Sequence, residues 1–314
     1  MNTIPSFRLG TRGSPLAMWQ ARQVQALLSE KRPDVVVEII VIHTTGDKIL
    51  DKPLVQLGGK GVFTKEIEHA LLAGEIDFAV HSYKDLPTQL PDGLEIVSIP
   101  ERDSPFDALL AREGRLLKEL PPHPTIATGS LRRRAQVLAA RPDATVVDLR
   151  GNVNTRLRKY HESHWDAMIM AEAGLRRMGW ADRIAGILPI EEMLPAPAQG
   201  ALAIEAREED ERTQALLRAI HDDAAAAGAR AERAFLATLE GGCQVPIAAY
   251  AVVENGSLTL HGLVSSLDGT QRVRESETAG LDDPEGTGRR LAERVWKSGG
   301  REIIEALRSA NESR

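Results

Sequence analysis

Short apolar runs alternate with amphipathic stretches through the N-terminal half of this chain of 314 residues. The alternation is typical of βαβ units, in which each helix returns the chain over a largely parallel sheet. Residues 7–9 are predicted as a strand. Ser14-Pro15 then starts a helix, since serine caps helices and proline fits their first turn. Further elements are predicted as strands at 35–42 and 78–81 and a helix at 65–73.

Two crossings divide this pattern into lobes. Residues 101–115 are rich in charge and interrupted by Ser104-Pro105, and residues 189–197 contain three prolines, so both are predicted to connect domains. After the second crossing, residues 201–205 are predicted as a strand that returns to the first lobe. Between the crossings the α/β pattern restarts, with a helix capped by Ser130 and strands and helices in alternation at 125–127, 131–140, 145–149, 154–160 and 167–170.

The last third of the chain has a different character. A helix at 224–239 is followed by strands at 247–253 and 257–264, and Asn255-Gly256 between them is typical of a tight hairpin. A third strand at 271–278 and a mostly helical segment at 283–308 complete a small α+β domain with an antiparallel sheet. The predicted domains are 1–102 with 198–220, then 103–197, then 221–314.

Composition excludes several classes of protein. Hydrophobic residues make up 42% and charged residues 27%, as in ordinary soluble domains, and no apolar run reaches the ~20 residues that span a bilayer. A net charge of −6 and 4% aromatic residues argue against broad nucleic-acid binding. Residues 1–9 lack the cationic flank and apolar core of a secretory signal. Because a single cysteine cannot form an internal disulfide, we expect a reducing, cytoplasmic location.

Cationic side chains follow the predicted strands at the point where each strand ends. Ligands of open α/β sheets bind beyond these carboxyl ends, where helix N-termini also favour anions. Arginine suits the planar recognition of carboxylate or phosphate. We therefore expect a polyanionic ligand in a crevice between the two lobes; the alternative is that these groups are ordinary solvated surface charges. The side chains concerned are Arg12, Lys84, Arg132, Arg133, Arg150 and Arg156.

Two further residues are candidates for chemistry. Asp85 is a carboxylate among cations, and it could stabilise a developing cation or relay a proton to a leaving amine. Alternatively, it forms a salt bridge with Lys84 or caps a helix. Cys243 lies between two glycines and Pro246, which predicts a loop. Its thiol could carry a covalent attachment, or it could be a small buried hydrophobe.

Several common site motifs are missing from the sequence. Gly58-Gly59-Lys60-Gly61 lacks the Ser or Thr that follows lysine in a Walker A loop. No Gly-x-Gly-x-x-Gly follows a predicted strand, and Gly-x-Ser-x-Gly does not occur. The eight histidines are scattered, and His161 and His164 are interpreted as helix surface, so no metal site is predicted.

An ordered set of segments resembles the porphobilinogen deaminase family. The segments follow one another in the family's order from residue 8 to residue 246. Any one of them is suggestive, and the ordered set is highly specific. They are RLGTRGSPLA at 8–17, TTGD at 44–47, GGKGVFTKE at 58–66, HSYKDLP at 81–87, GSLRRR at 129–134, LRGNVNTR at 149–156, PAPAQGAL at 195–202 and EGGCQVP at 240–246.

The resemblance implies a transferase of tetrapyrrole, porphyrin and heme biosynthesis, an activity also called hydroxymethylbilane synthase. The fold would combine two lobes similar to those of periplasmic binding proteins with a small α+β domain that holds a three-stranded antiparallel sheet. Four porphobilinogen molecules are joined head to tail with loss of ammonia, and the product passes to the next tetrapyrrole enzyme. Family members carry a dipyrromethane cofactor as primer on a cysteine thioether, here Cys243. A cytoplasmic monomer without metal, nucleic acid or membrane partner is expected.

The resemblance also implies functional roles for individual residues. Asp85 matches the family's catalytic acid, which would assist ammonia loss and stabilise the resulting azafulvene cation. Phe63, Thr128 and Gln199 would contact substrate, although Phe63 could instead be a core residue before the helix at 65–73. Hinge movement between the lobes is expected near Ser104 and Pro197. The residues that would hold cofactor and substrate carboxylates are Arg12, Ser14, Lys84, Ser130, Arg132, Arg133, Arg150, Arg156 and Arg177.

Two other classes of function compete with this interpretation. A non-catalytic two-lobe receptor for a small polyanion would carry no thioether and release no ammonia. A hydrolase or acyltransferase with Cys243 as nucleophile would be inactivated quickly by thiol alkylation. Intact-protein mass spectrometry distinguishes all three.

Overall fold

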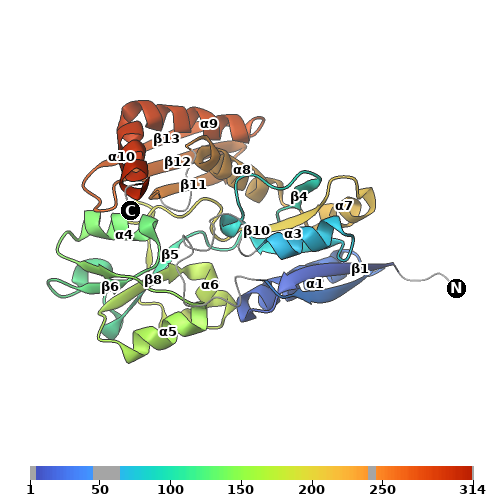
Figure 1. The fold of residues 1–314 in the computed structure, drawn as a ribbon, viewed down its shortest axis with the longest axis horizontal. Helices are drawn as coiled ribbons and strands as arrows, with labels where there is room; N and C mark the ends of the chain where they lie inside the picture. The colour runs from blue at the N-terminus through green and yellow to red at the C-terminus, as the bar shows by residue number, and fades with distance from the viewer. Residues whose placement is uncertain (1–4, 45–63, 240–244, 313–314) are drawn as a thin grey trace. The chain divides into compact units, whose positions relative to one another are not determined.

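The computed structural model describes residues 5–44, 64–239 and 245–312. The chain forms two compact units, Met1–Arg102 with Ala201–Ala226 and Asp103–Gly200 with Ala227–Arg314. Within the described ranges there are three sheets, two of five strands and one of three (Figure 1). The second five-stranded sheet and the three-stranded sheet belong to the same unit. The boundaries of the three predicted domains stay a prediction.

The first lobe is a mixed sheet covered by helices on both faces. Its strands are β1 (Ser6–Arg12), β2 (Val36–Ile42), β3 (Phe78–Ser82), β4 (Leu94–Ser98) and β10 (Leu202–Arg207). Its helices are α1 (Pro15–Lys31), α3 (Lys65–Leu72) and α7 (Glu211–Leu217). The strand order is β2-β1-β3-β10-β4, in which the first three strands are parallel and β10 is antiparallel to both neighbours. Helices α1 and α7 cover one apolar face, and α3 covers the other.

The second lobe repeats this topology. Its strands are β5 (Asp107–Ala111), β6 (Thr125–Ala127), β7 (Thr145–Val147), β8 (Ala167–Ala171) and β9 (Gly186–Leu188). Its helices are α4 (Leu131–Ala140), α5 (Val153–Glu162) and α6 (Glu172–Arg177). The order β7-β6-β8-β5-β9 again places three parallel strands beside one antiparallel strand. In each lobe that fourth strand, β10 or β5, is the one that follows a crossing from the other lobe.

The C-terminal part packs helices on one face of an antiparallel sheet. The elements are α8 (Asp223–Thr238), β11 (Ile247–Glu254), β12 (Ser257–Ser265), β13 (Arg272–Gly280), α9 (Pro284–Val295) and α10 (Arg301–Glu312). Phe235 of α8 and Leu291 of α9 pack in the same apolar cluster as β11 and β12. Asn255 and Gly256 join these strands with φ angles of 52° and 75°, which a tight hairpin requires and which Asn and Gly tolerate best. The other face of the sheet packs against Leu194 of the second crossing.

Most elements predicted from the sequence are confirmed to within a few residues. The prediction that 101–115 is entirely a crossing is wrong, because β5 occupies Asp107–Ala111. Charged residues on both sides masked this short apolar run, which is buried because it pairs with both β8 and β9. The sequence analysis did not identify β4, β9, α6 or α7, all of which are short.

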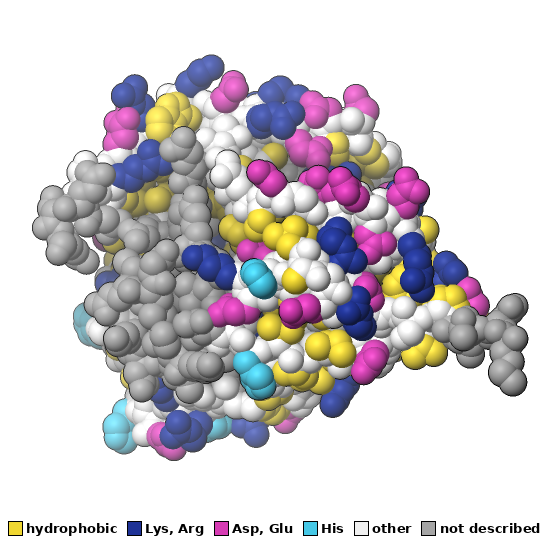
Figure 2. Space-filling model, turned by 45° about the vertical axis from the view of Figure 1, so that its right-hand side comes forward, with side chains coloured by type: hydrophobic (Ala, Val, Ile, Leu, Met, Phe, Trp, Pro, Cys, Tyr) yellow, Lys and Arg dark blue, Asp and Glu magenta, His cyan; other side chains and the backbone are white. Residues whose placement is uncertain are grey.

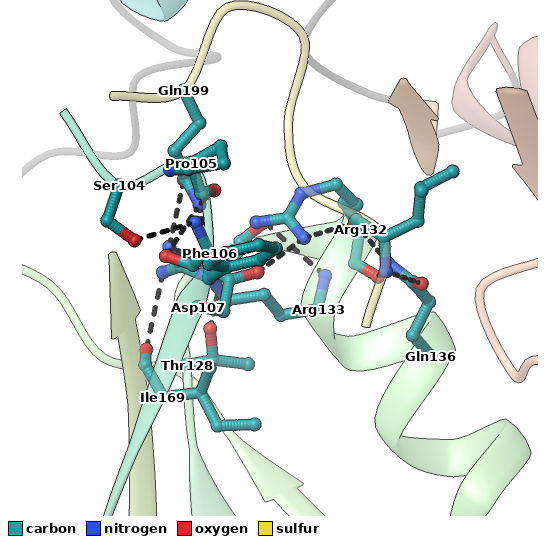
Figure 3. A network of polar contacts seen from close by, with 12 residues as sticks. Ser104, Pro105, Phe106, Asp107, Thr128, Arg132, Arg133, Gln136, Ile169 and Gln199 are labelled. Carbon is teal, nitrogen blue, oxygen red and sulfur yellow. Dashed lines mark hydrogen bonds and ion pairs between the residues drawn. The ribbon is translucent and has the colours of Figure 1, made fainter. Parts of the chain in front are cut away.

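A buried ion network joins β5 to α4 (Figure 3). The Asp107 side chain is completely buried. Its carboxylate accepts hydrogen bonds from Arg132 Nη1 at 2.7 Å and from Arg133 Nε and Nη2 at 3.0 and 2.8 Å. Gln199 Nε2 donates a further bond of 2.8 Å. Burial alone would raise the pKa of Asp107, but the charges of Arg132 and Arg133 outweigh it and hold this pKa well below its ordinary range.

The same network holds the second crossing in place. Arg132 Nη1 donates to the Leu194 carbonyl at 2.8 Å, and the Gln136 side chain bonds both the carbonyl and the amide of Leu194. In the C-terminal part, the buried Glu232 carboxylate accepts from the amides of Ala198 and Ala251 at 2.5 and 2.7 Å. Residues 194–199 are therefore anchored by side chains from α4 and α8.

The protein surface carries charges of both signs. Among the described residues on the face shown in Figure 2, basic and acidic side chains are intermingled. Among the described residues, no helix is long and apolar enough to cross a membrane.

We predict that Asp107→Asn destabilises the protein by about 3 kcal/mol near pH 7, because it leaves two buried arginines without their anion. The native pKa of Asp107 is depressed, so its stabilising contribution is present above the unfolded value of about 3.9 and is lost as the pH falls below it. Urea unfolding between pH 7 and pH 3 should therefore show a flatter acid dependence for the variant than for the wild type.

Asp143→Asn is the matched control, since it breaks a more exposed pair with Arg141 in the same lobe. Asp143→Asn should lower the free energy of unfolding at pH 7 by much less than Asp107→Asn does. Equal stability of Asp107→Asn and the wild type would contradict the structural role of the network.

Candidate functional site

Four candidate side chains of the first lobe lie at one edge of its sheet. β1 ends at Arg12 and β3 ends at Ser82, and because these strands are parallel neighbours, their carboxyl ends meet at the same edge. Ser14 caps α1 there, and its hydroxyl accepts a 3.3 Å hydrogen bond from the Ala17 amide. Lys84 and Asp85 lie in a short 3-10 turn directly after β3.

Asp85 presents its carboxylate to solvent. The residue is exposed, and no described residue donates a hydrogen bond to it or forms an ion pair with it. A salt bridge with Lys84 and a helix cap, the two structural alternatives from the sequence, are therefore both missing from the described part of the chain. A carboxylate that follows a strand end and has no partner among the described residues is suited to interact with a positively charged group of a ligand.

The second lobe has an equivalent edge. β6 and β7 are parallel neighbours, and the loops that follow them bear Thr128, Ser130 and Arg150. The loops touch at Gly129, where a Cβ atom would lie 2.5 Å from the Leu149 carbonyl oxygen, so only glycine fits. The Ser130 hydroxyl caps α4 by accepting a 3.4 Å bond from the Arg133 amide. α5 begins beside this loop and adds Arg156, whose Nε donates to the Gly151 carbonyl at 2.7 Å.

The cationic residues of this edge differ in burial. Arg150 is exposed, and its Nε donates a 2.5 Å hydrogen bond to the carboxylate of Asp148, which is also exposed. Arg132 and Arg133 are 6% and 5% exposed, and both guanidinium groups bond Asp107. The Arg132 Nε atom is buried and has no hydrogen-bond partner among the described residues. This orphaned donor is unusual in a folded protein and fits a site that receives an anion.

Arg177 and Gln199 lie where the crossings meet. The Arg177 side chain is 7% exposed; its Nε donates to Asp103 at 3.1 Å and its Nη2 donates to the Gly200 carbonyl at 2.8 Å. Burial lowers the pKa of Arg177, and Asp103 opposes that shift. The fully buried Gln199 amide bonds the Pro105 carbonyl and Asp107. Thr128 is also buried. Direct contact of Gln199 or Thr128 with substrate stays a prediction, as do the roles of the other site residues.

Sequence reasoning missed the residues that support this edge. Asp107, Asp103 and Gln136 each hold a candidate residue or a crossing, yet none was singled out. One signal was available, because two adjacent arginines at a helix start need an anion if they are buried. Cys243 and Phe63 lie outside the described residues. Within the described ranges, no group of three or more His, Cys, Asp and Glu side chains could hold a metal ion.

Comparison with known proteins identifies the family. Residues 7–215 match the family model "Porphobilinogen deaminase, dipyromethane cofactor binding domain", and residues 226–297 match "Porphobilinogen deaminase, C-terminal domain". The chain is 49% identical over 302 residues to the porphobilinogen deaminase of Syntrophotalea carbinolica, covering 96% of each chain. It is 49% identical over 297 residues to that of Geobacter sulfurreducens, covering 95% of this chain and 93% of the relative.

Similar solved structures are more distant. A Salmonella typhimurium periplasmic binding protein specific for arginine is 12% identical, with a TM-score of 0.40 over 71% of this chain and 94% of that one. A TRAP periplasmic solute binding protein from Desulfovibrio salexigens is 9% identical, with a TM-score of 0.42 over 70% and 73% of the two chains. The sequence matches cover both units at nearly half identity, and the chain therefore belongs to the porphobilinogen deaminase family.

Proposed function

We propose that this chain is the transferase that condenses four porphobilinogen molecules head to tail, releasing ammonia, to give the linear tetrapyrrole hydroxymethylbilane. The observation that carries this function is the identity of nearly half over almost the full length to proteins named porphobilinogen deaminase. The cofactor is dipyrromethane, the group named by the family model that matches residues 7–215. The two cationic sheet edges support the same function on physical grounds.

The substrate explains why so many cations are needed. Each porphobilinogen unit bears an acetate and a propionate, so the growing chain is a polyanion. Exposed Arg150 and the partly exposed Arg12, Lys84 and Arg156 bind these carboxylates, because guanidinium and ammonium groups donate strong charge-assisted hydrogen bonds to them. Ser14 and Ser130 stand at helix N-termini, where amide N–H groups and the helix dipole add to the attraction.

The buried residues of the second lobe suit the cofactor. Arg132 has an unpartnered buried Nε donor, and the Asp107 network fixes both Arg132 and Arg133 in orientation. These residues hold cofactor carboxylates, with Arg177 and Thr128 nearby in the same lobe. When bound to Cys243 through a thioether, the dipyrromethane supplies the pyrrole to which the first substrate is added.

Asp85 is the catalytic residue in this proposal. In each condensation the aminomethyl C–N bond breaks, ammonia leaves, and a C–C bond forms to the next pyrrole, which loses its ring proton. The positive charge that develops on the substrate as ammonia leaves is stabilised by the Asp85 carboxylate. The exposed carboxylate has no protein partner to displace among the described residues, so it is available for this contact.

The remaining aspects of the proposal concern the setting of the enzyme. It acts as a monomer in the cytoplasm and passes its product to the next tetrapyrrole enzyme. A single cysteine, reserved for the cofactor, suits a reducing compartment.

Cys243→Ser should yield an inactive protein whose intact mass equals that of the bare chain, since no other cysteine can carry the cofactor. The wild type should be heavier by one dipyrromethane. A wild-type chain with a bare thiol would reject the proposal and favour the two-lobe receptor or the cysteine hydrolase.

Asp85→Ala, loaded with cofactor, should lose about 100- to 1,000-fold in the rate of ammonia release, the usual cost of removing a group that stabilises transition-state charge. Asp85→Glu should retain part of the rate, because the charge survives in shifted geometry. Mass spectrometry should show that both variants still carry the cofactor. Wild-type turnover by Asp85→Ala would remove Asp85 from the mechanism.

Arg150→Gln should raise KM for porphobilinogen about tenfold, the effect expected from losing one charge-assisted hydrogen bond. Arg150 is a cleaner test than Arg132 or Arg133, which also neutralise buried Asp107. Arg158→Gln is the matched control, because Arg158 is exposed on α5 and pairs with Glu162. An equal KM for both variants would argue against carboxylate binding by Arg150.

A further inference from the structure

A polar cluster is buried on the α3 face of the first lobe. His81 of β3 and Glu205 of β10 are 7% and 0% exposed, and His81 Nε2 lies 2.9 Å from Glu205 Oε2. Glu68 of α3 is buried beside them. The cluster lies within the layer where Ala79 and Leu71 pack, so it replaces apolar contacts with polar groups.

Burying this cluster costs free energy of folding, because polar groups lose their contacts with water. Glu205 is the carboxylate that pairs with the imidazole, and one oxygen of Glu205 and one of Glu68 have no hydrogen-bond partner among the described residues. Burial raises the pKa of Glu68, and the nearby Glu205 adds to that increase. An apolar pair of similar size would often stabilise a domain as well as a buried ion pair does. Stability alone therefore does not account for His81 and Glu205.

The position of the pair suggests another role. His81 is the penultimate residue of β3, and Asp85 lies three residues after the strand ends. The pair joins β3 to β10. Just beyond the strands, the Tyr83 amide donates a 3.1 Å hydrogen bond to the carbonyl of Ala201, the residue before β10. On the opposite face, Gln20 Nε2 donates to the Ser82 hydroxyl at 2.7 Å. The end of β3 is thus held from both faces of the sheet.

We propose that His81 and Glu205 are positioning residues for Asp85. Their hydrogen bond locks the carboxyl end of β3 to β10 and so fixes the turn that presents Lys84 and Asp85. This inference rests on the catalytic role proposed above for Asp85. A displacement of about 1 Å at a reacting group can cost up to about 100-fold in rate, so loosening this strand end should affect the chemical step more than substrate binding.

The test compares four forms of the cofactor-loaded enzyme by kcat and KM for ammonia release from porphobilinogen. His81→Leu combined with Glu205→Met removes both members of the pair, so neither is left behind as an unpaired buried charge and the lobe should stay folded. We expect kcat to fall about tenfold or more while KM changes less than about threefold. His81→Gln, whose amide can still donate to Glu205, should recover most of the rate.

Asp77→Asn is the matched control, because Asp77 precedes β3 at its other end and pairs there with Arg8 at 2.7 Å. It should lower thermal stability without lowering kcat. The positioning role would be overturned if the double variant kept the wild-type kcat, or if its kcat fell no further than that of Asp77→Asn. The proposed function would still stand in either case. Absence of ammonia release by the wild type would instead reject the proposed function, and the inference with it.

Discussion

The second lobe depends on the buried ion pairs between the Asp107 carboxylate and two arginines of α4. The carboxylate neutralises Arg132 and Arg133 at the start of α4 and is bonded by Gln199 of the second crossing. Two adjacent arginines could not be buried there without an anion, because the desolvation of each charge would go uncompensated. The network therefore joins a helix start, the strand that enters the lobe and the segment that leaves it. It also leaves one arginine donor, Arg132 Nε, buried and without a hydrogen-bond partner among the described residues.

The repeated topology of the two lobes explains where the chemistry lies. Each sheet has three parallel strands whose carboxyl ends share an edge, followed by an antiparallel strand that starts at that edge. Polar residues after those strands are therefore gathered by backbone geometry before any side chain interacts. In the first lobe the edge bears an exposed carboxylate and cations, and in the second it bears mostly cations. That division fits a polyanionic substrate with one reacting amine.

The sequence predicted the fold and named most of the residues that lie at the two sheet edges, whose roles stay a prediction. Ser14 and Ser130 indicate the starts of their helices because serine caps a helix locally. Asn255-Gly256 indicates the hairpin because both residues tolerate positive φ. Each feature could therefore be identified without tertiary contacts. β5 was hidden because its burial comes from pairing with distant strands and not from its own short pattern. The partners Asp107 and Glu205 were missed for the same reason, since they lie 25 and 124 residues along the chain from the groups they contact.

The sequence by itself determined the order of the elements, the helix caps, the presence of cations after strands and the presence of a single thiol. These properties depend on neighbouring residues or on residue identity, so they can be read along the chain. Only the tertiary structure decided which arginines are exposed and which are buried in ion pairs with Asp107. It also decided that Asp85 has no ion-pair partner among the described residues. Burial and charge pairing are set by contacts between strands and helices far apart in the chain, which no local pattern encodes.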